Sequence, residues 1–432
     1  MGEEEIMLLK THIIVISTIL VLVNICFGYL YDYEPELISS DYRLAAMGGL
    51  DLVIRNWDNE LNMHDFGESP AGLIEDNEGY ATLYLPGAYG FTSFDDVYGE
   101  SNWDGYAISL LGVVPKTSSY AAAFSFNASS SDIVYDYVLD GFTYSYHYDN
   151  YGGMFSTAEK VSSWMILGFQ GRYDKRMTER SSGSNYDSYE QDRYMFKPAV
   201  FVTFPNRSWD MGINYTLTKI GTYTTAHHVA IPFICRSSRS VLGAKVAFGP
   251  IPHDDTWRRS IEVQSDYHIA VAHGSVDLGF LAKYGSPRMY EGFIIYSASG
   301  WNAALGAGAA YCYSTYGAVG IEYKLGIARY DVSAPFTRYQ HRISLGAERL
   351  FLEYFPVRIG YAKIIDDDPH YSYPSQDILT AGFGVRVPGT QLEIDFAYNS
   401  EIIRDSYYTI WDEYIDYTNI DHLFGLSGRM FW

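Results

Sequence analysis

Residues 420–432 read IDHLFGLSGRMFW, and this closing stretch decides the fold class because large apolar residues recur at every second position. They occupy most of the even-numbered positions, whereas Asp421, Ser427 and Arg429 occupy odd-numbered ones. Side chains at successive positions of a β-strand point to opposite faces of the sheet. The stretch therefore predicts a strand with one apolar face and one polar face.

A period of two recurs from about residue 78 to the carboxyl terminus. It is clearest in residues 260–271, 275–284, 317–330 and 390–399, where apolar residues alternate with charged or small ones. A soluble antiparallel sheet would show the same alternation, with its apolar face buried. These runs of about ten to fourteen residues exceed common globular strands and suit a tilted crossing of a bilayer. We therefore predict an all-β fold, a transmembrane antiparallel β-barrel of about 14–18 strands over residues 78–432.

The polar positions of these runs carry charges of both signs. We expect them to face the lumen, where acidic and basic groups pair with one another. The candidate lumen charges are Glu262, Asp266, Asp277, Glu322, Glu348, Glu393 and Asp395, with Lys283, Lys324, Arg342 and Arg429. Neither a Gly-x-Ser-x-Gly elbow nor a His-Glu-x-x-His motif accompanies the carboxylates. We therefore predict no catalytic residues, no metal site and no cofactor.

The composition is rich in tyrosine and acidic overall. Aromatic residues make up 17% of the chain, with 41 tyrosines, and a ring that ends in a hydroxyl suits the boundary between lipid and water. The net charge of −22 argues against a nucleic-acid partner, because phosphate backbones are bound by Lys and Arg. Cys235 and Cys312 would remain after loss of a leader containing Cys26, and free thiols are favoured over a disulfide between them.

The amino terminus has the pattern of an export signal. Lys10 precedes an apolar run over residues 13–23, which is too short to cross a bilayer as a helix. Small residues near position 28 suit cleavage there. We therefore expect residues 1–28 to be a signal peptide.

The last strand ends on an aromatic residue. Apolar residues at alternate positions before a final Phe or Trp resemble the signal read by the barrel-assembly machinery of the outer membrane. The residues that carry this resemblance are Phe424, Leu426, Met430 and Trp432. It implies the bacterial outer membrane as the location, with the lipid bilayer and the assembly machinery as partners.

Residues 29–77 do not alternate cleanly, and they carry the most specific motif of the chain. Residues 41–49 read DYRLAAMGG and residues 65–73 read DFGESPAGL, with Asp58 between them. This arrangement resembles the start of FadL-type outer-membrane transporters for long-chain fatty acids, including PorV-like barrels. The matching positions are Arg43, Met47, Gly48, Gly49, Asp58, Ser69, Pro70, Ala71 and Gly72, although Ser69 stands where the family usually has Asn.

The resemblance implies that residues 29–77 form an amino-terminal plug, or hatch, inside the lumen. Movement of the plug would let a hydrophobic, fatty-acid-like small molecule pass, whereas an immobile internal brace would carry the same sequence. Two alternative functions remain open at this point. One is a PorV-like barrel that docks secreted or surface proteins, and the other is a general porin with an open lumen.

Pro86-Gly87 interrupts the first predicted strand, since proline removes a ladder hydrogen bond and glycine marks a bulge or kink. In the resembling transporters a strand kink opens a lateral exit toward the bilayer, and we carry this role to Pro86 and Gly87 as a hypothesis. Polar, Tyr- and Asp-rich connections at 149–162, 177–193, 366–377 and 401–419 are expected to be the extracellular loops.

Overall fold

The computed structural model describes most of the predicted barrel and a few residues before it. The described residues are 47, 50, 52, 70–71, 80–94, 100–117, 119–137, 142–182, 185–204, 209–221, 224–251, 254–286, 288–291, 294–297, 300–314, 317–330, 336–352, 354–367, 375–386, 392–408 and 414–431. The predicted signal peptide 1–28 lies outside them, as do Arg43, Gly48, Gly49, Asp58, Ser69, Gly72 and Trp432.

Strands make up nearly all of the described residues. They are β1 (Tyr80–Phe94), β2 (Glu100–Thr117), β3 (Tyr120–Tyr137), β4 (Phe142–Ser162), β5 (Met165–Ser182), β6 (Asn185–Thr203), β7 (Trp209–Ile220), β8 (Thr224–Arg236), β9 (Ser240–Ile251), β10 (Asp254–Val271), β11 (Gly274–Gly285), β12 (Arg288–Glu291), β13 (Ile294–Ser297), β14 (Gly300–Ser314), β15 (Gly317–Tyr330), β16 (Phe336–Phe351), β17 (Phe355–Asp367), β18 (Ser375–Arg386), β19 (Leu392–Tyr408) and β20 (Tyr414–Phe431). Among the described residues, no helix is long and apolar enough to cross a membrane.

Eighteen of the described strands form one closed antiparallel sheet. Each strand pairs with its neighbours in chain order, and β20 pairs with β1 from Tyr80–Phe431 to Phe94–Tyr417. The small β12–β13 hairpin lies in the connection from β11 to β14, which pair directly. The sheet is therefore a barrel with no free edge. This confirms the predicted all-β barrel, and eighteen strands fall within the predicted number of 14–18.

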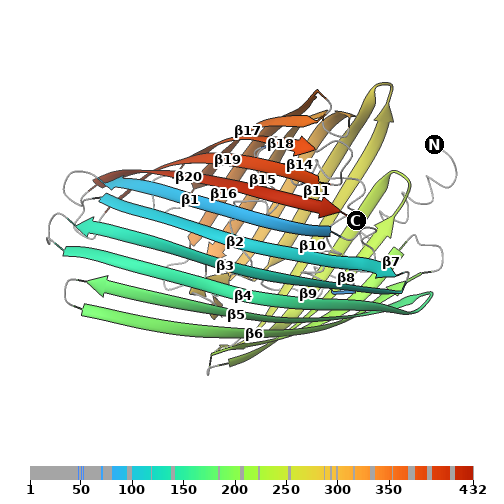
Figure 1. Ribbon diagram of the computed structural model, residues 1–432, viewed down its shortest axis with the longest axis horizontal. Coiled ribbons are helices and arrows are strands. Elements are labelled where there is room, and N and C mark those ends of the chain that lie inside the picture. Colours follow the sequence, from blue (N-terminus) through green and yellow to red (C-terminus); the bar gives the residue numbers. More distant parts are fainter. Residues whose placement is uncertain are drawn as a thin grey trace.

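The two ends of the barrel differ. Short turns close one end, such as the turn from Val271 to Gly274. The first residue of β1, Tyr80, pairs with the last residue of β20, Phe431, so β1 begins and β20 ends at this same end. We call this the turn end, and the opposite end the loop end. Figure 1 shows β1–β6 side by side across the front, with strands of the opposite wall behind them.

Burial shows which face of the wall points outward. In β7, exposed and buried side chains alternate from Trp209 to Asn214, and the exposed ones are apolar. Met211 is 41% exposed and Ile213 52%, whereas Asp210 and Asn214 are buried. A sheet that folds in water would bury the opposite set. The apolar outer face and the closed hydrogen-bond ladder together make this a transmembrane barrel, because lipid can cover apolar side chains but cannot satisfy open strand edges.

Aromatic side chains edge the apolar outer face. At the turn end, Trp209 stacks on Phe204 with ring centroids 5.2 Å apart. Tyr215, Tyr323 and Tyr398 all stand six residues from the first residue of their strands and form hydrogen bonds on the outer face. The aromatic pair at the turn end suits one boundary of a membrane barrel, whereas the three tyrosines lie within the apolar band, because six residues of a tilted strand rise less than the ~25 Å of such a band.

Two of the predicted extracellular loops were wrong. Residues 149–162 lie entirely within β4, and residues 177–193 form most of the hairpin between β5 and β6. Their backbones pair without interruption from Tyr144–Ser182 to Lys160–Ile166 and from Met165–Val202 to Ser182–Asn185. Tyr, Asp and Arg side chains suit residues 177–193 because the ends of β5 and β6 lie past the apolar band, whereas residues 149–162 include the turn end of β4. Most of residues 401–419 also lie in strands, in β19 up to Tyr408 and in β20 from Tyr414, and residues 366–367 and 375–377 lie in β17 and β18.

Candidate functional site

The inner face of the wall is polar and tightly hydrogen-bonded. Buried polar side chains include Gln170, Asp174, Gln191, Asn302, Glu322, Glu348 and Arg358. These residues come from strands on both sides of the barrel, so the polar character runs around the lumen. Buried charges of this kind are stable only when they are paired, and the contacts below supply the partners.

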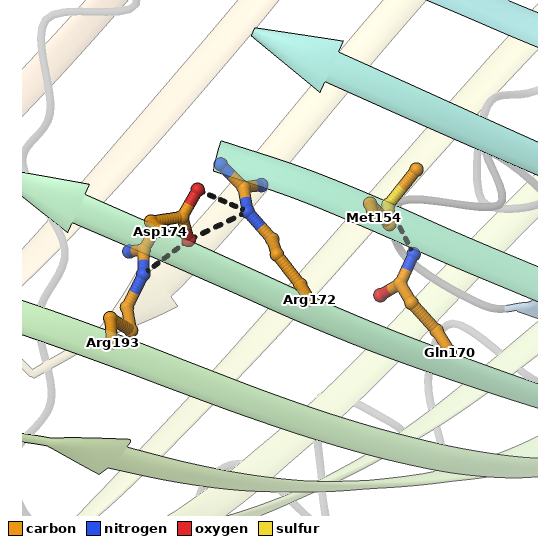
Figure 2. A network of polar contacts seen from close by, with 5 residues as sticks. All are labelled: Met154, Gln170, Arg172, Asp174 and Arg193. Carbon is orange, nitrogen blue, oxygen red and sulfur yellow. Dashed lines mark hydrogen bonds and ion pairs between the residues drawn. The ribbon is translucent and has the colours of Figure 1, made fainter. Parts of the chain in front are cut away.

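Asp174 on β5 is the centre of the first cluster. The guanidinium of Arg172 donates through Nε to both carboxylate oxygens at 2.9 Å, and Arg193 on β6 donates through Nε at 2.9 Å (Figure 2). A side chain at Gly152 on β4 would place its Cβ 2.4 Å from Oδ1 of Asp174, so this glycine makes room for the carboxylate. Two cations around one carboxylate leave the cluster with a net positive charge.

Gln170 lies on the same face of β5, four residues closer to the turn end than Asp174. Its amide donates to the sulfur of Met154 at 2.8 Å and to the hydroxyl of Ser156 at 3.1 Å (Figure 2). All three groups are uncharged, so the inner wall of β4–β6 combines a cationic cluster with neutral hydrogen-bonding groups.

Arg358 on β17 is the centre of a second cluster on the far side of the ring. It is 3% exposed, donates through Nε to Glu348 at 2.8 Å and also pairs with Asp395. Gly384 leaves the space for this arrangement, since a Cβ there would lie 2.5 Å from the Asp395 carboxylate. The structure thus brings together Glu348 and Asp395, two of the predicted lumen charges.

Most other predicted lumen charges also find partners on the inner face. Their contacts are Glu262 with Lys245 at 3.6 Å and Lys283 at 3.8 Å, Asp277 with His268 at 2.6 Å and the Cys312 thiol at 3.1 Å, Glu322 with Lys324 at 3.7 Å, Arg342 with Ser344 at 3.2 Å, and Glu393 with Arg386 at 2.6 Å. Asp266 lies on the same face of β10, and Arg429 lies opposite Glu393 in the backbone register of β19 and β20. Cys235 and Cys312 are free thiols.

Sequence reasoning missed the Asp174 cluster. The alternation of Arg172, Asp174 and Arg176 along one strand face could have revealed it, but these residues lie between the predicted loops 149–162 and 177–193, and Arg193 was assigned to the second loop. Asp366 was missed for the same reason, although it is buried and pairs with Arg338 on β16.

Residues of the amino-terminal segment contact the inner wall of β11–β16. Met47 and Leu50 are fully buried there, and the backbone of Leu52 donates to Glu322 at 2.6 Å. A Cβ at Gly346 would lie 2.2 Å from the Met47 carbonyl, and one at Gly279 would lie 2.1 Å from the Leu52 carbonyl. At Gly279 and Gly346 the backbone of the wall therefore lies closer to the amino-terminal segment than it could if either position carried a side chain.

A second contact lies on β5. Pro70 and Ala71 are buried, and a Cβ at Gly168 would lie 2.3 Å from the Ala71 nitrogen. Ala71 packs in a cluster with small and apolar wall residues, among them Ala123 and Phe201. Gly168 and Gly346 lie on opposite sides of the barrel, because eight strands separate β5 from β16 in each direction around the ring.

Pro86 interrupts the pairing of β1 without shifting it. The ladder with β2 passes from Tyr84–Ser109 to Gly87–Tyr106 with no register change, whereas pairing with β20 continues through Pro86–Gly425. The predicted interruption is thus a local gap in the described ladder and not a bulge. Similar gaps occur at Pro198 in β6 and Pro232 in β8, on the two sides of β7.

The chain was compared with protein-family models, curated proteins and solved structures. No protein-family model and no curated protein matches the chain. Among solved structures, it is similar to a Pseudomonas aeruginosa FadL homologue, with 13% identity, a TM-score of 0.46 and coverage of 94% of this chain and 99% of that one. It is also similar to the Pseudomonas putida toluene transporter TodX, with 12% identity, a TM-score of 0.45 and coverage of 92% and 99%. The Ralstonia pickettii toluene transporter TbuX gives 12% identity, a TM-score of 0.42 and coverage of 91% and 99%.

Proposed function

We propose that this protein is a bacterial outer-membrane barrel that passes hydrophobic small molecules through a lumen closed by residues 29–77. The observation that carries the proposal is the seating of Met47, Leu52 and Ala71 on opposite inner walls. A chain fixed at both sides of a barrel crosses its lumen between the two contacts. TodX and TbuX, named above, are toluene transporters, and toluene is a hydrophobic small molecule.

In this proposal the two contacts have different roles: one anchors the plug to the wall and the other releases it. The contact at β11–β16 combines a buried backbone hydrogen bond from Leu52 to Glu322 with close packing, so it is the firmer anchor. The contact at Pro70–Ala71 rests on packing around Gly168 and is the one that releases. Release at one side would open a path while the segment stays attached at the other.

We further propose that the gap at Pro86 serves as the lateral exit. Proline cannot donate to the ladder, so the β1–β2 seam at Leu85 and Pro86 is held less tightly than its surroundings. Leu85 is exposed on the outer face beside this gap, which gives a leaving molecule an apolar surface to follow. The seams at Pro198 and Pro232 offer a matched comparison.

Native mass spectrometry of the detergent-purified protein tests the function itself. The proposal expects a fatty acid or other apolar ligand bound in stoichiometric amount. A barrel without any such ligand, whether or not apolar compounds are added, would contradict the proposal and favour the docking of secreted or surface proteins. The extension of β3–β6 beyond the apolar band is the feature that such partners would meet.

We interpret the charged clusters as ion pairs that stiffen the wall and hold the plug, and we assign them no catalytic step. A general porin is the less favoured alternative, because a segment that crosses the lumen would obstruct free flow of water and solutes.

A further inference from the structure

Arginine and tyrosine side chains gather on the inner face of β4 and β5 near the loop end. Arg176 lies over the ring of Tyr148, 5.1 Å from its centroid, and Arg180 lies over the ring of Tyr146 at 5.5 Å. The two rings are stacked, with centroids 6.2 Å apart and planes 5° from parallel. The two arginines share the inward parity of the buried Asp174, and the register of β4 and β5 places both tyrosines on the same face.

Stacking on the rings leaves the hydrogen-bonding edges of the two guanidinium groups available. A stacked guanidinium uses its flat face, whereas its N–H donors lie in the plane of the group as a fork that matches a carboxylate. Within the described part of the chain, the tyrosine rings are the partners of Arg176 and Arg180. Arg180 leans toward Tyr146 on β4 and so away from Asp187, its register partner on β6. The rings therefore hold the arginines in place without using their donors.

The same inner face carries more cations than acids. Its described inward positions along residues 172–180 of β5 and 187–193 of β6 hold the cations Arg172, Arg176, Arg180 and Arg193 and the acids Asp174 and Asp187. Arg172 and Arg193 bind Asp174 deeper in the wall (Figure 2). Arg180 lies close to Ser182, the loop end of β5. In a chain of net charge −22, this local excess of positive charge attracts anions toward the lumen from the loop end.

A further tyrosine lies on the other side of β5. Tyr148 on β4, Thr178 on β5 and Tyr189 on β6 form one row across the strands, since Thr178 pairs with both tyrosines. Tyr189 shares this inward face and is 49% exposed. Neighbouring strands lie about 4.8 Å apart, so the two tyrosine backbones are roughly 10 Å apart across the smaller threonine. Exposed rings at this spacing suit packing against another aromatic ring.

We propose that the Arg–Tyr face, which consists of Tyr146, Tyr148, Arg176, Arg180 and Tyr189, binds aromatic carboxylates that enter from the loop end. The ring of such a molecule packs against the tyrosines, and its carboxylate accepts hydrogen bonds from the arginines. The tyrosines favour this ligand over an inorganic anion, and the guanidinium donors favour it over a neutral hydrocarbon. The inference rests on the proposed function, since it names a class of molecule that the barrel takes up, but binding is measurable without transport.

The test is binding of benzoate to the detergent-purified full-length protein, measured by saturation-transfer-difference NMR, with benzamide as a neutral ligand of the same shape. The double substitution Arg176→Gln/Arg180→Gln is expected to weaken benzoate binding by about fivefold and to leave benzamide binding unchanged. Arg176→Lys keeps the charge but loses the planar fork, so it should weaken benzoate binding as Arg176→Gln does. Tyr189→Ala should weaken the binding of both ligands.

Lys175→Gln is the matched control. It removes a positive charge from the same strand, but Lys175 points outward and its ammonium group lies 2.7 Å from Glu190, so benzoate binding should not change. Electrophoretic mobility with and without heating checks that each variant folds, and the single variant Arg180→Gln carries the test if the double variant does not fold.

Four results would overturn the proposal. They are equal benzoate binding by the double variant and the unchanged protein, an equal loss in Lys175→Gln, an equal loss of octanoate binding, and displacement of benzoate by inorganic phosphate at the same concentration. The third result would assign the arginines to carboxylates in general, and the fourth to a free anion. Benzoate that binds as expected but is not taken up into vesicles would support the Arg–Tyr face and contradict the proposed transport.

Discussion

At the scale of single residues, the wall is shaped as much by absent side chains as by charged ones. Gly152 and Gly384 leave space for the carboxylates of Asp174 and Asp395, and Gly168 leaves space for the chain at Ala71. The charged residues themselves follow from the alternation in the sequence, since the inward parity was predicted for Glu322 and Glu348 and both are buried. The glycine positions could not be assigned in advance, because their role depends on which backbone approaches them.

Substitution of Gly168 tests the contact at β5. Gly168→Val should displace Pro70 and Ala71 without unfolding the barrel, because the added carbons collide with backbone and the strand pairing is untouched. Limited proteolysis should then cleave residues 29–77 at least several-fold faster. Gly171→Val on the same strand is the control, since the nearest atom to its Cβ is 3.9 Å away. Equal cleavage of both variants would show that Gly168 does not hold the segment.

Arg358 should be the most costly of the lumen cations to remove. Arg358→Met leaves Glu348, which is 1% exposed, without its guanidinium partner, and breaking a buried pair in this way costs about 3–5 kcal/mol. Arg386→Met is the comparison, because the Arg386–Glu393 pair is about a quarter exposed on both sides and should cost about 1 kcal/mol or less. Urea unfolding in lipid vesicles measures both values, and similar losses in the two variants would contradict this ranking.

At the scale of strands, strands with regular apolar alternation are predicted well from the sequence, whereas long polar strands are predicted poorly. The runs 260–271 and 317–330 were predicted as strands and lie in β10 and β15. Residues 149–162 were assigned to a loop because Tyr, Asp, Gly and Lys gave no apolar face, yet β4 continues through them. Residues 153–162 are the ten closest to the turn end of β4, and Gly153, Thr157 and Glu159 interrupt the outward apolar series that Phe155 and Val161 belong to. Residues 177–193 lie beyond the apolar band, where both faces of a strand meet water, so the apolar parity disappears while the hydrogen bonds continue.

The gap at Pro86 allows a prediction at this scale. Pro86→Val with Gly87→Thr should restore the missing rungs between β1 and β2 and reduce uptake of a hydrophobic probe, while folding is unchanged or more stable. Pro198→Val, which closes a comparable gap between β6 and β7, should leave uptake unaffected. Uptake that is unchanged in the first variant would exclude an exit at β1, and loss only in the second would move the exit to β7.

At the scale of the whole molecule, closure of the sheet and the path of the amino-terminal segment decide what the barrel can do. Closure was predictable from the long alternating strands, because a membrane leaves no other arrangement for them. The place where the described amino-terminal residues meet the wall was not predictable, since the motif at residues 41–49 and 65–73 carries no information about the strands that receive it. The structure supplies this information, with Leu50 near Cys312 on one side and Ala71 near Gly168 on the other.

Transport through a barrel with a tethered plug is the measurement that tests the central claim most directly. Leu50→Cys can be joined by a short thiol cross-linker to the native Cys312, which packs against the same cluster, and Ala71→Cys can be joined to Ala123→Cys, from the cluster in which Ala71 packs, as a second tether. Uptake of a hydrophobic fluorescent probe into vesicles should persist with the first tether and fall at least tenfold with the second, and a cleavable linker should restore it. Equal uptake by the untethered protein and by both tethered forms would show that the segment is a fixed brace and contradict a gated lumen.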